Sequence, residues 1–192
     1  MIFCFVLTTV NLDLLLKGAT VLLGIVTIWK ALKEFAHNRR QREIDLAWRQ
    51  SEAAKKIIDD WMDDDESHDF CKMIEYNKRK FINEQGDEFW TDTDTIRNAI
   101  ISVDADYSDK IEVNKRSIRD RCDSFLYFTE MMSQGERNNL YRLQDLVFPL
   151  RYYLKRMADK ELYEPLREYA RTNKFSCQDK LFDRILNYPL SD

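Results

Sequence analysis

The chain has 192 residues, a net charge of −4, four glycines and three prolines. The near-balanced charge argues against binding of nucleic-acid duplexes, and the scarcity of glycine argues against a phosphate-binding α/β fold. Charged residues make up 33% of the sequence and aromatic residues 12%, a mixture typical of a helical bundle with a charged exterior.

The first predicted element is an apolar segment from Leu12 to Leu32, with the sequence LDLLLKGATVLLGIVTIWKAL. A helix needs about 20 residues to cross the hydrocarbon core of a bilayer, and this segment has that length. No residue between Gly18 and Trp29 is charged, and Trp29 fits the aromatic belt at a membrane interface. We therefore predict an N-terminal membrane anchor, residues 1–33, with a single span from about residue 12 to 32.

Three other interpretations of this segment stay open. The apolar stretch Met1–Val10 joins the membrane region as an interfacial or tilted extension, or the segment is a signal peptide, or it is the buried core helix of a soluble protein. The signal peptide is disfavoured because no basic region precedes the apolar run. The small pair Gly18–Ala19 also comes before the longest apolar run, not after it.

A basic cluster follows the apolar segment, whereas the N-terminal side carries only Lys17 and Asp13. The positive-inside rule then places the remainder of the chain in the cytoplasm, as expected for a single-pass protein of a bacterial inner membrane. The same side chains would attract anionic lipid headgroups. We name this set the membrane flank; it consists of Lys30, Lys33, Arg39, Arg40 and Arg42.

The helix is expected to continue beyond the membrane as a juxtamembrane helix over residues 34–66. No proline or glycine occurs from Phe35 to Trp61, and apolar residues recur at helical spacing, which suits packing on a domain or on a second copy. An acidic run begins at Asp59 and opposes the dipole at a helix C-terminus, so the helix should end near Asp63. Ser67 or Asp65 can then cap the next helix.

A cytoplasmic helical domain is predicted for residues 67–192, which makes the fold class all-α. The helix that begins near Ser67 should run to about Glu84 and stop at Gly86, which suits a left-handed C-terminal position. A loop follows, and Asp92 or Asp94 caps a helix that extends through Val103.

The most amphipathic predicted helix covers residues 111–133 and should end at Gly135. Pro149 should kink or split the helix that follows from about Asn138, and two short helices are expected over residues 160–172 and 178–187. The buried face of the 111–133 helix is predicted to contain Ile118, Cys122, Phe125, Phe128, Thr129 and Met132.

The densest basic patch of the domain lies on the opposite face of this helix and is the candidate binding site for an anionic ligand. Arginine can hold a phosphate with two parallel hydrogen bonds, and the domain's tyrosines offer surfaces on which a base can stack. The alternative interpretation is a charged helix face with no ligand. The candidate residues are Lys115, Arg116, Arg119 and Arg121.

Neither a catalytic site nor a metal centre is expected. His68–Asp69 resembles the His–Asp pair of metal phosphohydrolases, but the only other histidine that could serve as a ligand is His37. The acidic run lacks the spacing of a calcium loop, and the four cysteines form no C-x-x-C pair. We therefore predict no cofactor and no enzymatic activity, with an enzyme of another type as the third hypothesis.

Several segments together resemble a family of small bacterial membrane-anchored helical proteins of unknown function. They are the N-terminal span, RRQREIDLAWRQ, RSIRDRCDSFLYFTEMMSQG and LYEPLREYA. Phe125, Phe128, Glu130 and Met131 match the family's helix pattern loosely. The resemblance implies a fold and a topology, and no activity. Single-span proteins of this size are also similar in architecture to membrane effectors of bacterial antiviral defence systems, some of which are switched by cyclic nucleotides.

Two functions follow from these observations as expectations. The first is a membrane-tethered cytoplasmic helical module without enzymatic activity, which binds a protein partner or forms a homo-oligomer. The second is a ligand-gated membrane effector, in which the basic patch binds an anionic nucleotide and oligomerisation disturbs the bilayer.

Overall fold

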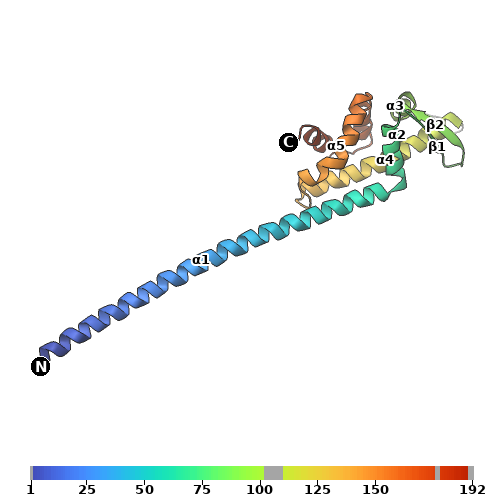
Figure 1. Ribbon diagram of the computed structural model, residues 1–192. Coiled ribbons are helices and arrows are strands. Elements are labelled where there is room, and N and C mark those ends of the chain that lie inside the picture. The colour runs from blue at the N-terminus through green and yellow to red at the C-terminus, as the bar shows by residue number, and fades with distance from the viewer. Residues whose placement is uncertain (1, 102–109, 176–177, 190–192) are drawn as a thin grey trace. The chain divides into compact units, whose positions relative to one another are not determined.

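The computed structural model describes residues 2–101, 110–175 and 178–189, with side chains from residue 17 onward except at 110 and 111. The described residues form seven helices and one pair of antiparallel strands (Figure 1). The predicted helical class is therefore confirmed as the dominant architecture. The chain divides into two compact units, Met1–Trp48 and Arg49–Asp192.

The first unit consists of the N-terminal part of helix α1 (Ile2–Asp63). This helix ends at Asp63, as the acidic run predicts. The N-cap of the next helix is Asp64, whereas Asp65 or Ser67 was predicted. The Asp64 backbone is extended, and its carboxylate accepts hydrogen bonds from the Ser67 amide at 2.8 Å and from the Ser124 hydroxyl at 2.6 Å. Asp64 thus caps helix α2 (Asp65–Glu75) and also bonds to the central helix of the second unit.

The predicted helix to Glu84 is wrong, because α2 ends at Glu75 and a β-hairpin follows. Strand β1 (Lys78–Ile82) pairs with β2 (Glu88–Asp92), where a loop was expected. Side chains alternate between solvent and core, and Phe81 and Phe89 both point inward. Gly86 has a φ of 84° and serves the turn between the strands instead of a helix end.

Helix α3 (Thr93–Ile101) is capped by Asp92, whose carboxylate accepts from the Thr95 amide at 2.8 Å. Asp92 is one of the two predicted caps. The predicted extension of this helix to Val103 lies outside the described residues. Helix α4 (Lys110–Arg137) then passes through Gly135, so the predicted stop at this glycine is wrong. A Cβ at position 135 would lie 2.0 Å from the Tyr141 ring, so Gly135 allows a close approach of this ring to the helix.

The ends of three helices share one arrangement. After α4, α5 (Leu143–Asp159) and α6 (Tyr163–Thr172), a non-glycine residue takes a left-handed backbone, and the next amide bonds back to a carbonyl five residues earlier. These bonds are 2.8–2.9 Å long and run from Leu140 to Gly135, from Leu162 to Met157 and from Phe175 to Ala170. The left-handed residues are Asn139, Glu161 and Lys174.

The core of the second unit forms around α4, which carries the predicted buried face. The Phe125 ring lies 5.9 Å from the Trp61 ring and 5.4 Å from the Phe70 ring, so α1, α2 and α4 meet there. Of the six residues predicted to be buried on α4, five are, whereas Phe128 is only half-buried. Helix α7 (Gln178–Leu186) is tied to α4 by a buried hydrogen bond of 3.0 Å from the Thr129 hydroxyl to Gln178.

Helix α5 contains Pro149 and stays one element, so of the two predicted outcomes, a kink or a split, the split does not occur. Its first turn is attached to α1 within the second unit. Arg142 donates two hydrogen bonds of 2.8 Å to Asp145 and one to the Ser51 hydroxyl. These bonds fix the α1–α5 contact at the edge of an apolar groove described below.

Candidate functional site

The four residues of the predicted anion site all lie on α4, and each is bonded within the protein. Lys115 pairs with Glu112 at 2.7 Å, and Arg116 with Glu84 at 2.9 Å. Arg119 donates to the Ala99 carbonyl of α3, and Arg121 to the Ile82 carbonyl of β1. The side chains of Arg119 and Arg121 are only 14% and 15% exposed, so this part of the patch joins elements of the domain.

A pair of carboxyl groups lies beside this patch. Burial, and after it a hydrogen bond to Glu84, together raise the pKa of Asp120 to about 6. The Glu84 carboxylate bonds to Arg116, which lowers the pKa of Glu84. The hairpin thus contacts α4 beside one carboxyl group, that of Asp120, whose pKa of about 6 makes the contact sensitive to pH.

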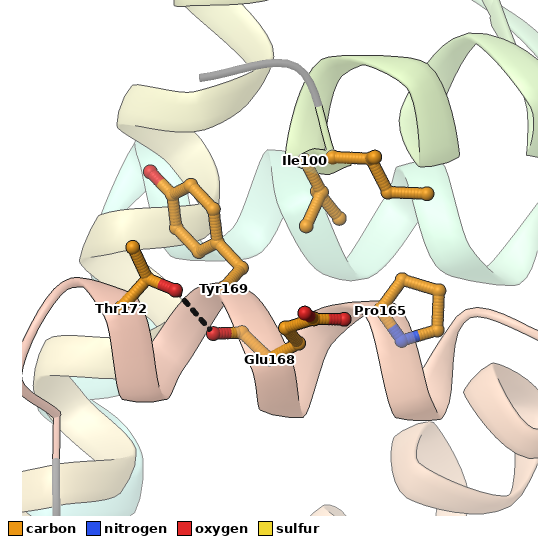
Figure 2. Close-up of a pocket in the computed structure, with 6 residues that line it drawn as sticks. Ile100, Pro165, Glu168, Tyr169 and Thr172 are labelled. Carbon is orange, nitrogen blue, oxygen red and sulfur yellow. Dashed lines mark hydrogen bonds between the residues drawn. The ribbon is translucent and has the colours of Figure 1, made fainter.

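Two small cavities are found among the described residues of the domain. Figure 2 shows one of about 120 Å³ between α3 and α6, where the Thr172 hydroxyl bonds to the Glu168 carbonyl. Tyr169 also lines this cavity, but its hydroxyl donates to Asp123 at 2.9 Å. The second, of about 210 Å³, lies between the hairpin, α3 and α4 and is lined by Trp90 and Lys115. In the first cavity, the hydroxyls of Thr172 and Tyr169 therefore both have partners within the protein.

Within the described residues, no group of three or more metal-ligating side chains is close enough to hold an ion. Cys71 and Cys122 are both buried, and burial raises the pKa of each thiol. A neutral buried thiol is a poor nucleophile and a poor metal ligand.

The apolar side chains of α1 form an exposed surface in the first unit. Successive helical residues differ by about 100° in direction, so this run points to several sides of the helix. The eight large apolar residues from Val21 to Leu32 are 57–69% exposed; they are Val21, Leu22, Leu23, Ile25, Val26, Ile28, Trp29 and Leu32.

The membrane flank follows on the same helix and is exposed as well. The Lys33 ammonium lies 5.5 Å from the Trp29 ring, and Arg39 pairs with Glu43 at 3.1 Å. Lys30 is 4.0 Å from Glu34.

Among the residues that the structure describes, no helix combines the length and the apolar character needed to cross a membrane.

A second apolar surface lies in the other unit, between α1 and α5. Here a groove of about 600 Å³ is bordered by Phe148, which is 90% exposed. This groove is not predicted from the sequence, because Phe148 lies off the apolar stripe of its helix. The available signal was its spacing of four residues from Tyr152, which puts two aromatic rings on the outer face. The groove is lined by Ile58, Met62, Asp145, Phe148, Pro149, Tyr152 and Tyr153.

Comparison with known proteins yields no match to a family model, to a curated protein or to a solved structure. The resemblance to small bacterial membrane-anchored proteins therefore stays a prediction from sequence pattern. The two exposed apolar surfaces, one in each unit, are the strongest indications of binding in the described residues.

Proposed function

We propose that the protein is a membrane-tethered helical interaction module, with its N-terminal segment in the bacterial inner membrane and its helical domain in the cytoplasm. The observation that carries the proposal is the exposed apolar surface of α1 between Val21 and Leu32. A helix that is apolar on most sides needs lipid or protein around it, because contiguous apolar surface is costly to keep in water. The side chains of residues 12–16, at the start of the predicted span, lie outside those described.

The membrane flank supports the orientation. Its basic side chains lie at and just beyond the C-terminal end of the apolar run, and they are exposed, which suits residues at the cytoplasmic headgroup level. Lys33 above the Trp29 ring combines the two residue types that anchor helices at interfaces.

The nucleotide-gated alternative lacks an observation of this kind. Each of Lys115, Arg116, Arg119 and Arg121 already has a carboxylate or carbonyl partner in the protein. An anionic ligand would have to displace these partners. The interaction module therefore has the better support.

Membrane fractionation of the full chain tests the anchor. We expect the wild-type chain in the membrane fraction, resistant to alkaline carbonate, and a reporter fused after Asp192 to read as cytoplasmic. The double variant Leu22→Arg/Val26→Arg should be released, since each arginine near the middle of a span costs about 2.5–3.5 kcal/mol. Leu46→Arg is the matched control, because Leu46 is 57% exposed on the same helix but lies beyond the apolar run. A wild-type chain found wholly in the soluble fraction would overturn the anchor.

A further inference from the structure

We propose that the groove between α1 and α5 is a homodimer interface, in which the α5 helices of two copies pack antiparallel around a two-fold axis. This inference deepens the proposed interaction module by naming its partner as a second copy of the chain. It rests on three observations: an exposed ring beside a cavity, the charges along α5, and the effect of Pro149.

The ring and the cavity belong to the same surface. Phe148 is 90% exposed, and beside it lies a groove of about 600 Å³, within the size range of about 300–1,000 Å³ typical of binding pockets. A two-fold axis uses the same patch twice, so each copy inserts its Phe148 into the groove of the other. Another kind of partner would have to supply both a projecting ring and a matching cavity.

The outer face of α5 supplies the rings that meet across the two-fold axis. Its exposed residues recur at helical spacing and are Gln144, Phe148, Tyr152, Lys155, Ala158 and Asp159. In the antiparallel arrangement centred near residue 150, Phe148 of one copy packs against Tyr152 of the other. Edge-to-face or offset contacts between such rings stabilise interfaces beyond the area that they bury.

The charges on α5 are complementary only in this antiparallel direction. The same centring places Asp145 opposite the second copy's Lys155, and Arg142 within one position of its Asp159. Arg142 and Asp145 already pair at 2.8 Å, so the second copy would complete a network of four charges on each side of the axis. A parallel pairing would instead place Lys155 against Lys155 and Asp159 against Asp159, which is repulsive.

Pro149 adds a polar acceptor at the same place. Proline has no amide hydrogen, so the Asp145 carbonyl lacks the donor that position 149 of a helix normally supplies. Asp145 also lines the groove. The ammonium group of the second copy's Lys155 can therefore donate to this carbonyl as well as to the carboxylate.

The test is the mass of the full chain in mild detergent, measured by light scattering across a dilution series. We expect a concentration-dependent dimer, and Phe148→Glu should weaken the association about 30-fold or more, as does loss of a central aromatic anchor. Trp90→Glu is the matched control, because Trp90 is an exposed aromatic residue of the hairpin, at 56%, and does not line the groove. Phe148 is so exposed that its replacement should leave the fold intact.

Zero-length crosslinking of mixed isotope-labelled and unlabelled chains tests the register. We expect a bond between Asp145 of one copy and Lys155 of the other. These residues are ten positions apart on one helix, about 15 Å along its axis, so a single copy does not form this link. A monomeric wild-type chain, or a dimer that persists in Phe148→Glu without this crosslink, would overturn the proposal. A monomer that fractionates with the membrane would leave the anchor standing, whereas a soluble dimer would leave the interface standing without the anchor.

Discussion

Phe125→Ala is the sharpest test of how the second unit is held together. Phe125 is fully buried on α4, and its ring contacts those of Trp61 and Phe70 at centroid distances of 5.9 and 5.4 Å. Truncation of a buried phenylalanine costs about 3–5 kcal/mol, through lost burial and the cavity left behind. Two aromatic contacts, each worth about 0.5–1.5 kcal/mol, place this site toward the upper part of that range.

The assay is urea unfolding of the full chain followed by tryptophan fluorescence. Of the four tryptophans, Trp61 is fully buried, whereas Trp29, Trp48 and Trp90 are 56–71% exposed. The shift of emission on unfolding therefore reports on the core around Phe125. With a slope of about 2 kcal/mol per molar urea, a loss of about 4 kcal/mol lowers the midpoint by about 2 M.

Tyr127→Ala is the matched control, because Tyr127 is an aromatic residue of the same helix that is 57% exposed. Its replacement should change the free energy of unfolding by less than about 0.5 kcal/mol, as is usual for surface sites. A change of this small size for Phe125→Ala would refute the assignment of the core.

Two further predictions concern the ends of α4 and its contact with the hairpin. Gly135→Ala should lower the free energy of unfolding by about 1–3 kcal/mol in the same assay, because the new Cβ meets the Tyr141 ring at 2.0 Å. In a Tyr141→Ala background the same substitution should be neutral or stabilising. A loss of stability that persists in this background would exclude the clash as its cause. Asp120 has a pKa of about 6 in the folded chain against an ordinary value of 3.8, so folding takes up a proton and stability falls as the pH rises through this window. Asp120→Asn should therefore flatten the pH profile of the urea midpoint between pH 3.8 and about 6, and it should raise the free energy of unfolding at pH 7. An unchanged profile would contradict the role of this carboxyl group.

Helix periodicity predicted much of the second unit. The end of α1 at Asp63, the Asp92 cap and most of the buried face of α4 followed from local rules of dipole, capping and spacing. These rules succeed because the groups that determine them lie within a few residues of one another. Phe128 departs from the pattern because it lies at the edge of the apolar face.

The hairpin could not be found in this way. Lys78–Ile82 contains one buried residue, Phe81, and three basic ones, a composition that fits a helix as well as a strand. The strand exists because β2 pairs with it and because Arg121 donates to the Ile82 carbonyl from 39 residues away. A pattern search over one segment contains no information on such partners.

The candidate anion site shows the same limit. The sequence places four basic residues on one helix, but their carboxylate and carbonyl partners come in part from the hairpin and α3. Conversely, the groove beside Phe148 combines residues of α1 and α5 that are about 90 positions apart, as Ser51 and Asp145 are. Whether a basic or an aromatic residue is available for binding depends on these distant contacts.

The three left-handed helix ends have a consequence for sequence variation in this protein. Asn139, Glu161 and Lys174 occupy positions where glycine is the residue of lowest strain, and a side chain there costs about 1–2 kcal/mol. Asparagine tolerates this backbone best, so position 139 has little to gain. Glycine at positions 161 and 174 would release strain without touching the core. Glycine at these two positions would therefore raise the free energy of unfolding. The more stable chain could then tolerate an otherwise damaging substitution elsewhere.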